Sequence, residues 1–145
     1  MRKMFVYGLA LTLAAFLVMG TSADTPKPVP KGKTRAAETK YLMRGIMGPN
    51  CGPLKDELKD KGPADDKAWD TVASQAAVLN ELSYVLMEDD RCPAKDWEAA
   101  AMTLREGSSK LLEAAKAKKT EDAQAAFKSM TGSCGACHSV YKPKK

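Results

Sequence analysis

The sequence has only one histidine, His138, and aromatic residues make up 6% of its 145 positions. A single histidine excludes a metal site built on several imidazoles. Runs of β-branched residues are scarce, so strands are not expected. No nucleophile, general base or substrate pocket can be recognised, so the sequence does not predict an enzyme. Its lysines are not interleaved with aromatic residues, so no nucleic-acid partner is expected.

The first residues are typical of a secretory signal peptide. Arg2 and Lys3 supply positive charge, an apolar run covers 4–19, and small residues lead up to Ala23. The run is shorter than the roughly 20 residues of a membrane-spanning helix, so a retained anchor is the weaker alternative. We therefore expect a signal peptide at 1–23 and a periplasmic mature protein. No cysteine lies near the cleavage point, so no lipid attachment is expected.

The rest of the chain divides into a tether and one domain. Segment 24–34 is rich in proline and lysine and has no apolar periodicity, which predicts a flexible segment. Segment 35–145 has the length of a single domain. The formal net charge is +5, and loss of the two cationic residues Arg2 and Lys3 would leave +3. Such a mild excess can steer an acidic partner but is mainly a solubility feature.

Apolar residues recur at steps of three and four residues in four parts of 35–145, which predicts four helices. Short connections between four helices predict an all-α fold, an antiparallel up-and-down four-helix bundle. Alanine is frequent on the predicted inner faces. Small side chains there would leave space for a large planar cofactor, although alanine is also the best helix former.

Proline, glycine and capping residues predict where these helices begin and end. The first helix begins near Arg35 and is interrupted at 48–53, which contains two prolines and two glycines. The second follows a cap at Asp65 and Asp66, the third has Pro93 in its first turn, and the fourth starts after a cap at Thr120 and runs through Tyr141.

The most informative motif is the segment Cys134-Gly135-Ala136-Cys137-His138, which has the C-x-x-C-H pattern of haem c attachment. On a helix the two cysteines and the histidine are spaced at i, i+3 and i+4 and therefore share one face. Two thiols can add to the two vinyl groups of one haem, and the adjoining imidazole can reach its iron. The motif predicts one haem c per chain, attached at Cys134 and Cys137, with His138 as the proximal axial ligand.

Other uses of this motif fit the sequence less well. A thioredoxin-like redox pair requires a preceding strand, whereas this segment is helical. A zinc site would need Cys51 and Cys92 beside the single histidine. A disulfide between Cys134 and Cys137 would close a tight, strained loop. The alternative from another functional class is a haem-free helical interaction domain with a structural cysteine pair.

The second face of the iron cannot receive an imidazole, because the chain has no second histidine. Met43 and Met47 form an i, i+4 pair on the predicted first helix, and either could present a thioether to the iron if that helix faces His138. Methionine pairs on an inner helical face more often serve packing. Both roles stay open at this point.

The C-terminal segment resembles the class II cytochromes c, the cytochrome c′ family. The similarity lies in Ala125-Ala126-Phe127, in the stretch from Gly132 to Lys142 that contains the motif, and in Trp97 on the predicted third helix. It implies an antiparallel four-helix bundle with haem c near one end. It also implies that a homodimer can form through the first two helices.

Two branches of this family imply two functions. In the low-spin branch a first-helix methionine binds the iron and the protein transfers electrons. Here the stretch Tyr41 to Met47 is similar to exported relatives with methionine at the position of Met47, and Met43 is the less favoured candidate. In the five-coordinate branch an apolar residue blocks the distal face and the iron binds NO or CO. Aligned at Tyr41, that blocker would be Ile46. We therefore expect an electron carrier with a redox partner protein, and gas binding is the alternative.

Two further cysteines, Cys51 and Cys92, are not typical of the family. Both lie at turn-like breaks and would be exported to an oxidising compartment, so a disulfide could join them. It would tie the first helix to the connection between the second and third helices. Lys40 or Arg44 could pair with a haem propionate, although a solvated surface charge is the more common role for either residue alone.

Overall fold

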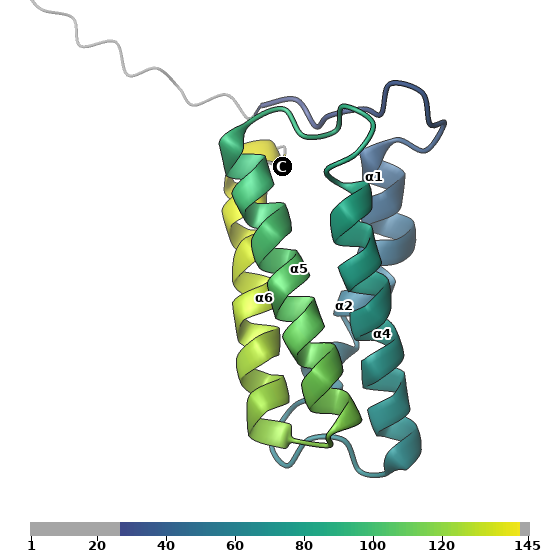
Figure 1. The fold of residues 1–145 in the computed structure, drawn as a ribbon, viewed down its shortest axis with the longest axis vertical. Helices are drawn as coiled ribbons and strands as arrows, with labels where there is room; N and C mark the ends of the chain where they lie inside the picture. The colour runs from purple at the N-terminus through teal and green to yellow at the C-terminus, as the bar shows by residue number, and fades with distance from the viewer. Residues whose placement is uncertain (1–26, 143–145) are drawn as a thin grey trace, which may run out of the picture.

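The computed structural model describes residues 27–142 (Figure 1), and all regular elements in this range are helical. The predicted signal peptide at 1–23 lies outside the described residues. The three long helices are α4 (Asp66–Val85), α5 (Lys95–Lys116) and α6 (Thr120–Tyr141), and α5 packs against the other two. The absence of strands between residues 27 and 142 confirms the all-α fold class. None of the described helices is both long and apolar enough to span a bilayer.

The first helical stretch consists of four short pieces: α1 (Thr39–Leu42), the π-helix η1 (Met43–Met47), α2 (Gly48–Cys51) and α3 (Leu54–Glu57). The predicted start near Arg35 is wrong, because the chain is extended at Glu38 (φ −70°, ψ 146°) and becomes helical only at Thr39. The stretch lies beside α4 (Figure 1), against which η1, α2 and α3 pack.

The π turn explains why the chain remains helical past its first proline, where the sequence predicted an interruption. Pro49 has no N–H to donate. The N–H of Gly48 bonds with the carbonyl of Met43, five residues earlier, and the Asn50 amide donates to the Ile46 carbonyl at 2.8 Å. The interruption predicted at 48–53 is therefore limited to Gly52 and Pro53, between α2 and α3. Single π turns inside helices often occur at functional sites.

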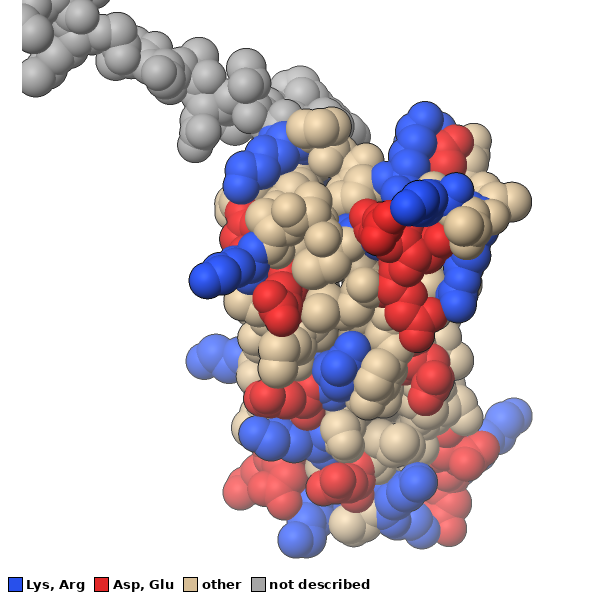
Figure 2. All heavy atoms as spheres, turned by 45° about the horizontal axis from the view of Figure 1, so that its top comes forward, with Lys and Arg blue, Asp and Glu red and all other residues tan. Residues whose placement is uncertain are grey.

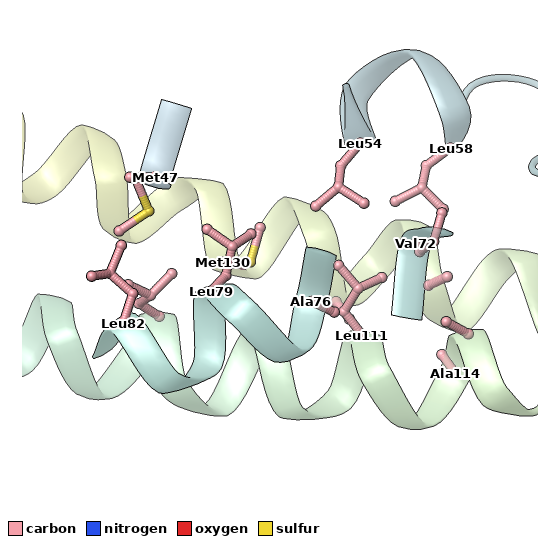
Figure 3. Close-up of a cluster of buried hydrophobic side chains, with 14 of the residues drawn as sticks. Met47, Leu54, Leu58, Val72, Ala76, Leu79, Leu82, Leu111, Ala114 and Met130 are labelled. Atoms are coloured by element: carbon pink, nitrogen blue, oxygen red, sulfur yellow. The ribbon is translucent and has the colours of Figure 1, made fainter. Parts of the chain in front are cut away.

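The core runs along the bundle between the first helical stretch and the three long helices. On α4 the apolar stripe is buried along its whole length, and it includes Val72 and Leu79, which are fully buried. Leu54 and Leu58 cover one part of this core, and Met47 lies over Leu82 in another (Figure 3). Complete burial of a leucine or valine side chain contributes about 1.5–3 kcal/mol.

The starts of α4 and α5 are set by the residues that directly precede them. Asp65 accepts the N–H of Ala68 at 2.8 Å, as expected for the start of α4. α5 begins at Lys95, so Pro93 precedes the helix and does not lie in its first turn. The reason is the extended backbone of Ala94 (φ −165°, ψ 166°), which is incompatible with a helical turn at that point.

Helices α5 and α6 approach each other closely at Gly107. A Cβ atom added to Gly107 would lie 2.8 Å from Cβ and 2.9 Å from Cα of Met130. Only glycine allows this separation, since real Cβ atoms do not come so close to a neighbouring backbone. The glycine therefore draws together the two helices that carry most of the candidate site.

The segment that precedes α1 is bonded to the bundle, although 24–34 was predicted to be flexible. The N–H of Lys27 donates to the Val140 carbonyl at 3.0 Å, and the Thr39 hydroxyl donates to the Pro30 carbonyl at 2.6 Å. The sequence does not reveal these contacts, because their partners are backbone carbonyls distant in sequence.

A buried ion pair holds the same segment near the α4–α5 connection. The Asp89 carboxylate accepts the N–H of Thr34 at 2.8 Å and its hydroxyl at 2.6 Å, and it lies 3.3 Å from the guanidinium of Arg91. These hydrogen bonds lower the pKa of Asp89 to about 2, the Thr34 hydroxyl having the largest effect. Arg91 is fully buried and also donates to the Ala37 carbonyl at 2.8 Å.

Candidate functional site

The C-x-x-C-H motif lies on the last turns of α6, which is helical without a break through Tyr141. Cys134, Cys137 and His138 all line one cavity, as their shared helical face requires. The opposite walls of this inner cavity come from η1 and from α5, which contributes the small or apolar residues Ala100, Ala101 and Leu104. The motif therefore faces an apolar space between three helical elements.

A second, outer cavity adjoins the first and opens toward solvent. The two share Met43, Trp97, Cys137 and His138 as lining residues, and the outer one also has Lys40, Arg44 and Lys142 at its edge. The inner cavity has a volume of about 40 Å³ and the outer cavity one of about 480 Å³. Volumes of about 300–1,000 Å³ are typical of small-molecule sites, so the outer cavity reaches this size and the inner cavity is a small apolar extension of it.

Two methionine side chains from η1 line the inner cavity together with His138. Met43 borders both cavities, whereas Met47 borders only the inner one and is buried, with 8% of its surface exposed. Ile46 is not among the lining residues of either cavity. The structure thus brings the predicted thioethers to the same space as His138.

The imidazole of His138 is in a setting that favours its neutral form. Burial lowers its pKa below the ordinary value, and the positive charge of Lys142 lowers it further. Only a neutral imidazole can offer a nitrogen lone pair to a metal. The local electrostatics therefore suit a ligand role at neutral pH.

The two motif cysteines differ in acidity, because their neighbours differ. Burial raises the pKa of Cys137 to about 11. A hydrogen bond with the side chain of Cys51 lowers the pKa of Cys134 to about 7, against the opposing effect of burial. The same interaction raises the pKa of Cys51. Since the thiolate is the nucleophilic form of cysteine, Cys134 is the more reactive of the two motif thiols.

Aromatic residues fix the end of α6 against α5. The indole N–H of Trp97 donates to the Leu86 carbonyl at 2.8 Å, and its ring meets that of Tyr141 edge-on at 5.0 Å. The Tyr141 hydroxyl donates to Asp96 at 2.7 Å, and Lys27 lies 3.0 Å from the same carboxylate. Hydrogen bonding to Tyr141 lowers the pKa of Asp96 to about 2, and burial raises that of Tyr141 to about 12.

The cysteines outside the motif are not joined to each other in the structure. All four cysteines are free thiols, and Cys92 donates weakly to the Ala94 carbonyl at 3.8 Å. A disulfide between Cys51 and Cys92 stays a prediction.

The residues around the inner cavity fit a covalently held haem. Two thiols and an imidazole face it from α6, two thioethers face it from η1, and its remaining walls are mostly apolar. The cationic side chains of the outer cavity could meet carboxylates, although Lys40 is also 3.2 Å from Glu38. Within 27–142 no group of three or more His, Cys, Asp or Glu side chains converges as a metal-ion site, so nothing there supports the zinc alternative.

Positive and negative side chains are mixed on the face of the molecule seen in Figure 2. Lysine and arginine are interspersed there with aspartate and glutamate. Nucleic-acid-binding surfaces usually concentrate positive charge, and this face does not.

Comparison with known proteins identifies the region that carries the motif. Residues 93–142 match the family model described as Cytochrome C′. No curated protein and no solved structure matches the chain. The matched range covers α5 and α6, and hence Trp97, Cys134, Cys137 and His138. This match supports the resemblance to the cytochrome c′ family seen in the sequence, over the region formed by α5 and α6.

Proposed function

We propose that this protein is a periplasmic c-type cytochrome that transfers electrons through a single haem. The observation that carries the proposal is the inner cavity, into which α6 directs two thiols and an imidazole while η1 directs two thioethers. The proposal includes an antiparallel up-and-down bundle, which is supported by the successive connections at opposite ends in Figure 1.

The bound haem would supply a one-electron couple between ferric and ferrous iron. Cys134 and Cys137 would hold the ring by thioether bonds, and His138 would offer its neutral nitrogen to the iron. A thioether on the other face favours the ferrous state and raises the reduction potential. The apolar walls from α5 exclude water, which acts in the same direction.

The distal thioether is proposed to come from the pair on η1. Met47 was favoured by the resemblance, but its burial in the core also gives it a packing role. Met43 shares both cavities with His138 and is therefore at least as well placed. Ile46 lines neither cavity, which gives the gas-binding alternative less support than the thioether pair.

We further propose that the protein is a carrier and not an enzyme, and that it meets a redox partner protein at the outer cavity. The side chains of Arg44 and Lys142 at that edge suit a partner with acidic groups around its own cofactor. Export rests on the predicted signal peptide, which lies outside the described residues.

The first experiment is a pyridine haemochrome assay on protein made with a haem c maturation system, followed by absorption spectra of Met43→Ala and Met47→Ala. We expect one haem per chain and a low-spin wild type. One of the two variants should become high-spin and bind carbon monoxide, while Met102→Ala, a control at an exposed methionine on α5, should not. Wild-type protein that is already high-spin and binds carbon monoxide would favour gas binding. Colourless protein would remove the haem proposal altogether.

A further inference from the structure

The imidazole assigned to the iron lies close to the end of a helix. His138 is one turn before the end of α6, which stops at Tyr141. The last turn of a helix opens easily, because its carbonyls have no partner within the helix. A histidine that has to keep one position there needs its turn to be supported by contacts from outside the helix.

Two other segments of the chain supply such contacts. The side chain of Tyr141 is buried, with 3% of the residue exposed, and its hydroxyl donates to Oδ1 of Asp96 in the first turn of α5 at 2.7 Å. The backbone N–H of Lys27 donates to the Val140 carbonyl at 3.0 Å, and its ammonium lies 3.0 Å from Oδ2 of Asp96. The last turn of α6 is therefore bonded to α5 and to the segment that precedes α1.

The same contacts reach the walls of the haem site. Tyr141 lies three residues after His138, so the two side chains share one side of α6, and both line the outer cavity. The ring of Trp97 lines both cavities and meets the Tyr141 ring edge-on at 5.0 Å, while the backbone N–H of Trp97 donates to Asp96 at 3.0 Å. A displacement of Tyr141 would therefore move the turn that carries His138.

Among these contacts, the hydrogen bond from the Tyr141 hydroxyl to Asp96 should contribute most. Its donor belongs to a buried residue, and its acceptor is a carboxylate, which forms stronger hydrogen bonds than a neutral group. The ion pair of Lys27 with Asp96 is exposed, and exposed ion pairs contribute little. Phenylalanine at position 141 would keep the ring and its contact with Trp97 and would remove only the hydroxyl.

We propose that Tyr141 and Asp96 are positioning residues for His138: their hydrogen bond holds the last turn of α6, so that the imidazole keeps one orientation toward the space assigned to the haem. The inference rests on the proposed function, since it treats His138 as a ligand of the iron. Both residues act through the helical backbone between 138 and 141. Lys27 adds a weaker support from the segment before α1.

The first test measures hydrogen exchange over 138–142, by mass spectrometry, in the full mature chain loaded with haem. The matched control is Tyr84→Phe, which removes the hydroxyl of an exposed tyrosine on α4 whose ring stacks on Arg105. We expect exchange to be about tenfold faster in Tyr141→Phe than in wild type and unchanged in Tyr84→Phe. In an Asp96→Ala background, Tyr141→Phe should have little further effect. Unchanged exchange in Tyr141→Phe, or an equal acceleration in the Asp96→Ala background, would overturn the proposal.

The second test records electron paramagnetic resonance spectra of the ferric iron, whose line widths report the spread of ligand orientations. We expect broader lines in Tyr141→Phe than in wild type, and unchanged lines in Tyr84→Phe. Wild-type line widths in Tyr141→Phe would leave the hydrogen bond a purely structural role and overturn the positioning of His138. If no variant acquires haem, the proposed cytochrome function fails, and exchange over 138–142 in the haem-free chain then decides whether the bond holds the turn, so the two failures are distinguishable.

Discussion

Replacement of Gly107 by alanine tests how closely α5 and α6 must pack to form the site. The added Cβ would lie 2.8 Å from Cβ, 2.9 Å from Cα and 3.0 Å from N of Met130, so the helices would have to separate. Overpacking of this kind costs about 1–3 kcal/mol. Alanine also gains about 0.8–1.0 kcal/mol of helix propensity over glycine, which would hide part of that cost in a single measurement.

Gly132→Ala is the matched control, because Gly132 lies within α6 and nothing lies within 4 Å of its added Cβ. Both variants gain the same helix propensity, so the difference between them isolates the steric cost. We expect urea unfolding, followed by circular dichroism, to give Gly107→Ala a free energy of unfolding about 1–3 kcal/mol below that of Gly132→Ala. Equal stability of the two variants would refute the close approach at Gly107.

Three further predictions concern the aromatic end of the site and the core. Asp96→Asn removes the carboxylate that accepts the Tyr141 hydroxyl. Because the pKa of Asp96 is about 2 in the folded protein and 3.8 ordinarily, the ionised carboxylate stabilises the fold above pH 3.8, and this stabilisation disappears as the pH falls toward 2. Urea titrations at several pH values should therefore show the variant and wild type converging in acid, and a constant gap would contradict this. Trp97→Phe should cost about 1–3 kcal/mol, since it leaves the buried carbonyl of Leu86 unpaired, and thermal unfolding should detect it; an unchanged melting temperature would exclude the hydrogen bond. Leu79→Ala, at a fully buried position, should cost about 2–5 kcal/mol in the same assay, and a loss below 1 kcal/mol would mean that Leu79 is not in the core.

The long helices were predictable because their burial is periodic in the sequence. Trp69, Val72 and Leu79 recur at helical spacing, and Asp65 marks the start of α4 by its side-chain chemistry. The motif on α6 was equally predictable, because spacing alone places the side chains of Cys134, Cys137 and His138 on one face of the helix. These features depend on residues that are close together in the chain.

The features that sequence reasoning missed depend on contacts between distant segments. The π turn at 43–47 arises from backbone bonds around Pro49, and proline alone indicates a break rather than a wider turn. The role of Gly107 is set by Met130 on another helix, which the sequence around Gly107 does not indicate.

The hydrogen bond from Lys27 to Val140 places both described ends of the chain at the same end of the bundle, beside the outer cavity that Val29 also lines. A purification tag or electrode linker fused close to either end would crowd the surface where a redox partner is expected to dock. The turn between α5 and α6 lies at the far end of the molecule (Figure 1). A label or surface attachment at Ala117 would therefore leave the cofactor end accessible and give immobilised molecules a uniform orientation.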